Sequence, residues 1–82
     1  MSHMGKALKI SADMIQRRYD VRMLLGDKYA ENVEVARRVI RGVAKDGGLT
    51  ISSAALSVAK NMSASGLDPS LVIAAFVEEC GA

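Results

Sequence analysis

The chain has 82 residues, half of them hydrophobic, and its eleven Lys and Arg against nine Asp and Glu leave a formal net charge of +2. A chain this short forms one domain with a small core, so it needs close helix packing, a cross-link, a metal or self-association to be stable. The lone cysteine, Cys80, excludes a disulfide within the chain, and the lone histidine, His3, leaves a metal site or general-base catalysis without its usual side chain. We therefore expect neither enzyme activity nor a cofactor.

The first three residues, Met1 to His3, are read as a cloning remnant, and residues 4–82 as a single helical domain. The longest apolar run, Leu71 to Val77, has seven residues, well short of the ~20 that a membrane span needs. The sequence shows no signal peptide, and a free thiol is typical of a reducing compartment. These features predict a cytoplasmic protein with no membrane contact.

The first helix is expected near residues 11–25, where Ser11 is a candidate N-cap and Gly26 a stop signal. Its apolar residues form two strips on nearly opposite sides of the helix. The main strip holds Ile10, Met14, Val21, Leu24 and Leu25, and the second strip holds Ile15, Tyr19 and Met23. A helix with two apolar strips usually contacts two neighbours, and in so small a domain one of them can be another copy of the chain.

The second helix is expected near residues 28–45, with Asp27 as its cap and Gly47-Gly48 as its end. Its apolar residues recur at spacings of four, three, four and three, which describes one continuous helical face. These residues are Tyr29, Val33, Ala36, Ile40 and Val43. We expect this stripe to face the core.

The third helix is expected near residues 51–64, with Thr50 as its N-cap, and the fourth near residues 69–79, with Asp68 as its N-cap and Pro69 at its first position. The apolar arc of the fourth helix covers about 240° of its circumference, which suggests burial on more than one side. The sequence therefore predicts an all-α, compact four-helix domain. We expect the first two helices to form a hairpin and the last two to pack on the stripe of the second.

Seven basic residues of the first two helices form the candidate partner-binding surface: Arg17, Arg18, Arg22, Arg37, Arg38, Arg41 and Lys45. A hairpin would bring them into one patch, which could meet the phosphates of a nucleic acid, an acidic protein or water alone. Glu34 precedes Arg38 by four residues, an orientation that favours an ion pair on the helix surface. Sequence-specific reading of DNA is not expected, because the fourth helix lacks the Arg, Lys, Asn or Gln that base edges require.

Two polar or reactive residues, Arg17 and Cys80, lie on apolar helix faces. Arg17 lies within the main apolar strip of the first helix, where it can cover apolar surface with its stem and keep its head in water, or serve as an interface arginine. Cys80 lies on the apolar arc of the fourth helix, where a free cysteine is commonly a buried small side chain. No feature of the sequence supplies the histidine or the lowered pKa that a nucleophilic cysteine needs.

These features favour a small helical protein–protein interaction module that self-associates and acts as a regulator or inhibitor by occupying a partner protein's surface. Its size, its lack of catalytic residues and its dense helices are similar in style to small regulators and inhibitors of phage, plasmid or bacterial origin. The candidates for a homodimer interface are Ile15, Tyr19, Met23, Val72, Ile73, Phe76 and Val77. The alternative is a small nucleic-acid-binding regulator that uses the basic surface of the first two helices.

Overall fold

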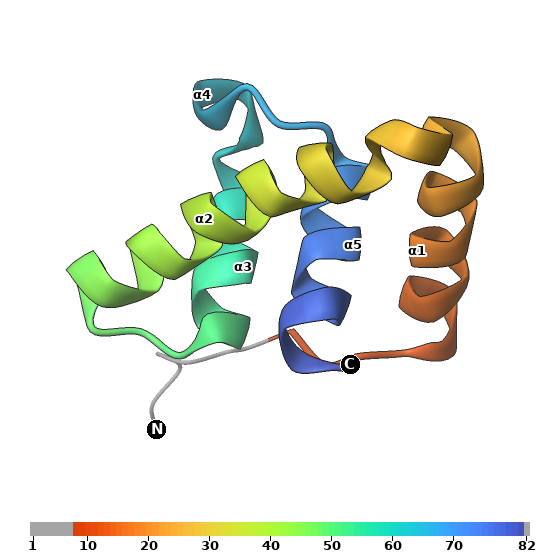
Figure 1. The fold of residues 1–82 in the computed structure, drawn as a ribbon. Helices are drawn as coiled ribbons and strands as arrows, with labels where there is room; N and C mark the ends of the chain where they lie inside the picture. The colour runs from red at the N-terminus through yellow and green to blue at the C-terminus, as the bar shows by residue number, and fades with distance from the viewer. Residues whose placement is uncertain (1–7, 82) are drawn as a thin grey trace.

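The computed structural model describes residues 8–81, so the expected remnant at residues 1–3 lies outside the described residues. Its elements are α1 (Ala12–Leu25), the 3-10 helix η1 (Gly26–Lys28), α2 (Tyr29–Gly47), α3 (Ile51–Lys60), α4 (Met62–Ser65) and α5 (Pro69–Cys80) (Figure 1). No strand occurs in this range. The predicted all-α class with four main helices is confirmed, and α4 is an additional single turn.

Helix α5 lies at the centre of the fold, where α1, α2 and α3 all pack against it (Figure 1). Its buried residues are Val72, Ala74, Ala75, Phe76 and Val77. The expectation that its wide apolar arc is buried on more than one side is confirmed. Three helices of the same chain provide that burial.

The predicted hairpin of α1 and α2 is wrong. Helix α1 packs along α5 and makes little contact with α2, whose axis turns away from it after η1 (Figure 1). The physical reason is that α3 and α5 already cover the apolar stripe of α2, whereas α5 has a further apolar side to bury. Val21 is the buried residue of α1 on this side, and Met14 and Leu25 pack beside it against the core.

Three of the four predicted N-caps are confirmed. The side chains of Ser11, Thr50 and Asp68 each accept a hydrogen bond from a backbone amide two or three residues later in the chain. Asp27 does not cap α2, because η1 runs directly into that helix and leaves Lys28 at the cap position without a side-chain bond. The turn between α1 and α2 is therefore a tight helical continuation rather than a capped start.

The end of α2 and the break after α3 follow from local backbone chemistry. Gly48 takes a left-handed φ of 62°, which glycine adopts at no steric cost, and the amide of Leu49 donates to the carbonyl of Ala44 at 2.8 Å. The third predicted helix is interrupted at Asn61, whose side chain donates to the carbonyl of Ser57 at 2.9 Å. Such a bond competes with the backbone ladder, and the chain continues as the separate turn α4.

The predicted stripe of α2 faces the core: Val33, Ala36 and Ile40 are buried, and Tyr29 and Val43 are partly buried. Small side chains let α2, α3 and α5 approach closely where they meet. Five alanines are fully buried there, namely Ala36, Ala54, Ala55, Ala74 and Ala75. The packing of the core therefore depends on close contact between helix backbones as well as on large apolar side chains.

Ile40→Ala is expected to lower the free energy of unfolding by about 2–5 kcal/mol, because Ile40 is fully buried and its truncation leaves a cavity. Chemical denaturation measures this change. The matched control is Val35→Ala on the same helix, where the side chain is half exposed and the loss should stay below about 1 kcal/mol. Equal losses for the two variants would contradict the assignment of the core face.

Candidate functional site

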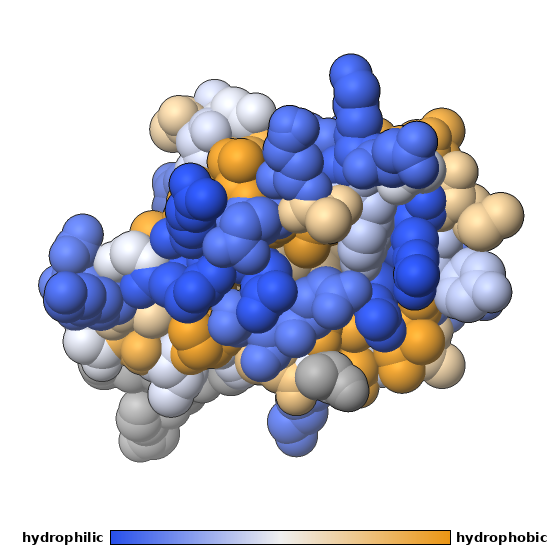
Figure 2. Space-filling view, in the orientation of Figure 1, coloured by the Kyte–Doolittle hydropathy of each residue, from blue (hydrophilic) through white to orange (hydrophobic). Residues whose placement is uncertain are grey.

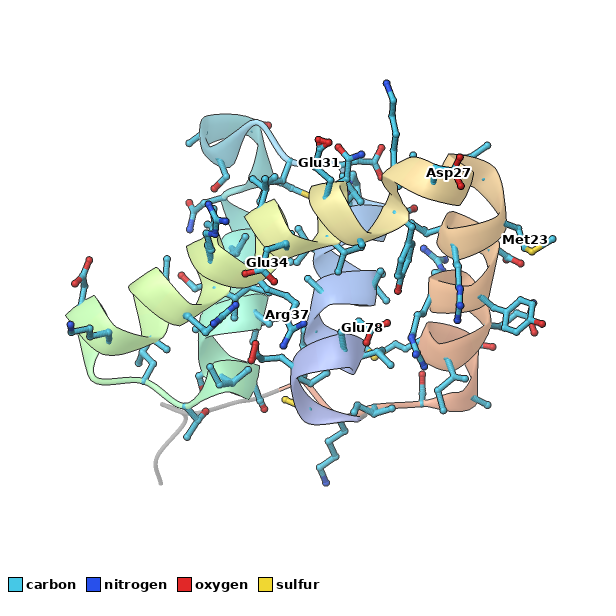
Figure 3. All side chains as sticks on the ribbon, viewed as in Figure 1. Met23, Asp27, Glu31, Glu34, Arg37 and Glu78 are labelled. Atoms are coloured by element: carbon cyan, nitrogen blue, oxygen red, sulfur yellow. The ribbon has the colours of Figure 1, made fainter. Side chains whose placement is uncertain are left out.

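Two adjacent carboxylates at the end of α5 tie the helices together. Glu78 lies between α5 and α1 (Figure 3), where its Oε2 accepts hydrogen bonds from Arg18 Nε at 2.9 Å and from the Tyr29 hydroxyl at 2.8 Å. Arg18 belongs to α1 and Tyr29 begins α2, so this one carboxylate joins three helices. A negative charge in the last turn of a helix is repelled by the negative end of the helix dipole, and the positive guanidinium of Arg18 offsets that repulsion.

The arginines of α2 surround Glu79 and Glu34. Glu79 Oε1 lies 3.2 Å from Arg37 Nε and 3.4 Å from Arg41 Nε, which joins α2 to the end of α5. Glu34 forms ion pairs with Arg37 at 3.8 Å and Arg41 at 2.9 Å. It also forms the predicted pair with Arg38, at 3.6 Å. Arg37 and Arg41 therefore each bridge two carboxylates.

The contacts of Glu78 set the charge states of its neighbours. Burial acts to raise the pKa of the Glu78 carboxyl, but the hydrogen bonds from Tyr29 and Arg18 outweigh burial and lower that pKa below its usual value. The pKa of the Tyr29 hydroxyl is raised, first by burial and then by its hydrogen bond to Glu78. At neutral pH an ionised carboxylate is therefore held between a charged guanidinium and a neutral phenol, an arrangement that we call the Glu78 clasp.

The structure does not gather the seven predicted basic residues into one patch. Four of them pair with the carboxylates described above: Arg18, Arg37, Arg38 and Arg41. The other three, Arg17, Arg22 and Lys45, form no ion pair with another residue in the range 8–81. Hydrophilic side chains cross this face as a band over α2 (Figure 2). Arginines and glutamates alternate within it, because α1 diverges from α2 and the end of α5 supplies carboxylates between them.

The second apolar strip predicted on α1 is exposed. The exposed fractions are 49% for Ile15, 62% for Tyr19 and 73% for Met23, and Met23 points away from the other helices (Figure 3). We call these three residues the outer ridge of α1. Leu24, predicted in the main strip, is 83% exposed, because it lies about 60° around the helix from the buried Val21. Helix α1 thus carries most of the exposed large apolar side chains in the described part of the chain.

A hollow of about 400 Å³ lies between the second half of α1 and the start of α5. It is lined by Arg17, Asp20, Val21, Leu24, Leu25, Asp68, Ser70 and Leu71. Arg17 is exposed beside apolar side chains, which fits the interpretation that its stem covers apolar surface while its head stays in water. A smaller hollow of about 100 Å³ lies on the outer ridge itself and is lined by Ile15, Arg18, Tyr19 and Arg22.

The α5 residues predicted for a dimer interface are covered by other helices of the same chain. Val72, Phe76 and Val77 are buried and Ile73 is partly buried, because three helices of the same chain cover the apolar arc of α5. The interface prediction is therefore wrong for α5. Cys80 is exposed, which corrects the expectation of a buried side chain, and its thiol pKa is raised by partial burial and by the charge of Glu79.

The sequence reasoning missed the three groups that organise the charged face, which are Glu78, Glu79 and the hydroxyl of Tyr29. One signal was present in the sequence, since two carboxylates in the last turn of a helix oppose the helix dipole and need cations nearby. Their partners are 60, 49 and 42 residues away along the chain, and helical periodicity carries no information about contacts at that separation.

Among residues 8–81, no group of three or more His, Cys, Asp or Glu is placed to hold a metal ion. No helix in the described chain combines the length and apolar character needed to cross a membrane. Comparisons with family models, curated proteins and solved structures gave no match. The candidate site is thus defined by geometry alone, as the outer ridge of α1 and the hollow beside it.

Glu78→Gln is expected to destabilise the fold by about 1 kcal/mol at pH 7, because it removes the charge of a partly exposed pair while keeping the shape of the side chain. The folded-state pKa of Glu78 is lowered, so the stability from ionisation is fully present above the usual value of 4.5 and is lost as pH falls through the folded-state pKa. The difference in unfolding free energy between the two proteins should therefore shrink below about pH 4.5 and vanish in stronger acid.

The control is Glu31→Gln, an exposed residue of α2 that makes no ion pair within the described residues. It should change stability little at any pH. Denaturation curves across this pH range decide the matter, and a loss for Glu78→Gln that stays constant down to strong acid would show that the clasp does not depend on charge.

Proposed function

We propose that the protein is a small protein–protein interaction module that forms a homodimer through the outer ridge of α1 and acts as a regulator or inhibitor by occupying a partner protein's surface. The observation that carries this proposal is the exposure of Ile15, Tyr19 and Met23 on a helix whose opposite side already packs on α5. Monomeric proteins rarely expose large contiguous apolar patches, and an apolar patch left in water often marks a contact surface.

The shape of the molecule supports a second copy as the occupant of the ridge. The domain extends 42 Å in its longest direction, and α1 stands at one end of the fold, with no other element of residues 8–81 in front of its outer side (Figure 1). A symmetric dimer would cover each ridge with the same ridge of the other copy. Because α1 has 14 residues and is about 21 Å long, the contact would be at the small end of interface sizes and the dimer would dissociate readily.

The hollow between α1 and α5 supports contact with a different protein as well. Its apolar lining offers room for one apolar side chain of a partner, and Asp68 lies at its edge, where it can meet a basic residue. A module of this kind acts without a chemical step, because covering a surface of the partner is enough to block or redirect it.

The alternative of a nucleic-acid-binding regulator has less support, because carboxylates of the same fold pair with four of the seven basic residues. Mobility-shift assays against pools of random duplex DNA, at near-physiological salt, are expected to show no selected sequence. A motif bound roughly a thousandfold more tightly than bulk DNA would overturn this expectation. Any weaker binding should be judged by its salt dependence, since phosphate contacts give a steep slope of affinity against salt.

The self-association is tested by sedimentation equilibrium of the wild-type chain and of Tyr19→Glu from micromolar to millimolar protein, since a small interface predicts a dimer that dissociates readily. The wild-type protein is expected to shift from monomer to dimer with concentration, and Tyr19→Glu to remain monomeric, because it places a charge in the middle of the apolar ridge. Since Tyr19 is exposed, circular dichroism should show an intact fold.

The matched control is Val35→Glu, which adds the same charge at an exposed apolar position of α2. It should leave the dimer unchanged. A wild-type chain that is monomeric at every concentration, or a dimer that Tyr19→Glu leaves intact, would overturn the proposed use of the ridge.

A further inference from the structure

We infer that two copies pair through α1 in a parallel orientation, with a two-fold axis running along the helix pair and Arg22 of each copy facing Asp20 of the other. This inference rests on the proposed function and specifies its interface. It comes from the charges on the two sides of the outer ridge, which have opposite signs.

The ridge residues Ile15, Tyr19 and Met23 span about 80° of the circumference of α1 at 100° per residue. The same spacing places Arg18 and Arg22 on one side of the ridge, and Asp13 and Asp20 on the other. The smaller hollow confirms one of these flanks, because Arg18 and Arg22 line it together with Ile15 and Tyr19. One long apolar row is thus bordered by a basic flank and an acidic flank.

The two flanks differ in the ion pairs and hydrogen bonds that their side chains already make within the chain. Arg18 belongs to the Glu78 clasp, so Arg22 is the arginine of this flank that makes no ion pair with another described residue. On the acidic flank, Asp20 Oδ1 accepts a hydrogen bond from Gln16 Nε2 at 3.0 Å, which leaves its second oxygen for an outside donor. Arg22 and Asp20 are two residues apart, about 3 Å along the axis, so a long arginine side chain can span the offset between copies.

Symmetry decides which orientation these charges favour. In a parallel two-fold pair, the basic flank of each helix faces the acidic flank of the other, and every Arg22–Asp20 contact occurs twice. In an antiparallel two-fold pair, the basic flank faces the basic flank, and the acidic flank faces the acidic flank. The apolar ridge is the same in both cases, so the charges select the orientation while the ridge provides most of the affinity.

A charge exchange tests the flanks. Arg22→Asp and Asp20→Arg should each weaken the dimer on the order of tenfold at low salt, because each one places like charges across both symmetric contacts. The double variant Arg22→Asp with Asp20→Arg exchanges the two flanks and should recover most of the wild-type affinity. A double variant as weak as the product of the two single losses would show that these residues do not face each other.

Cysteine cross-linking then reads the orientation directly, in a Cys80→Ser background. Ile15 and Met23 are eight residues apart, about 12 Å along the helix, whereas a disulfide requires Cα atoms within about 7 Å. In a parallel pair, Ile15→Cys should cross-link to itself and Met23→Cys to itself. In an antiparallel pair centred on Tyr19, neither variant cross-links alone, and only a mixture of the two does.

The control variant is Val35→Cys, an exposed position on α2 that should remain uncross-linked under the same oxidation. Self-cross-linking of Ile15→Cys and Met23→Cys supports the parallel pair. Cross-links formed only in the mixture overturn the parallel orientation while leaving the proposed homodimer standing. A chain that sedimentation shows to be monomeric, with no cross-link in any variant, overturns both.

Discussion

The apolar surface of α5 is too wide for one neighbour to cover, and this constraint sets the positions of the other helices. Val72, Phe76 and Val77 point in different directions around the helix, and α1, α2 and α3 each bury part of that surface. Because α2 packs on α3 and α5, one apolar side of α5 is left uncovered, and α1 packs against that side. The short η1 link allows this, because it lets α1 depart from α2 at a corner instead of folding back along it. The outer ridge of α1 faces solvent as a direct result, since one helix cannot turn both of its apolar strips toward α5.

The charges of the chain follow from the same arrangement. Helix α5 ends in two carboxylates that its own dipole disfavours, and the arginines of α1 and α2 that converge there stabilise it. Much of the positive charge of the first two helices is therefore engaged in holding the fold together. Apolar surface stays exposed in two places on the described part of the chain. These are the outer ridge of α1, with Arg22 on one side and Asp20 on the other, and the hollow at the start of α5.

The sequence was informative wherever the chemistry is local. The caps at Ser11, Thr50 and Asp68 need only a side-chain oxygen beside free amides, and the stripe of α2 needs only helical spacing. The sequence did not predict the packing correctly where two different helix arrangements would show the same local pattern of apolar residues. The main strip of α1 would fit α2 or α5 equally well, and the arc of α5 reads the same whether its cover comes from one chain or two. Leu24 shows a related limit, because it lies only about 60° around the helix from the buried Val21, and the sequence does not reveal how much of such an arc a neighbouring helix covers.

The most direct test of the central claim, that the outer ridge of α1 is the contact surface of this protein, is a concentration series of backbone amide chemical shifts by NMR from micromolar to millimolar protein. Each amide reports its own position, so the experiment locates the contact as well as detecting it. The ridge predicts concentration-dependent shifts centred on Ile15, Tyr19, Arg22 and Met23, with α3 unchanged. Spectra that do not change with concentration, or shifts centred on α2 or α3, would contradict it.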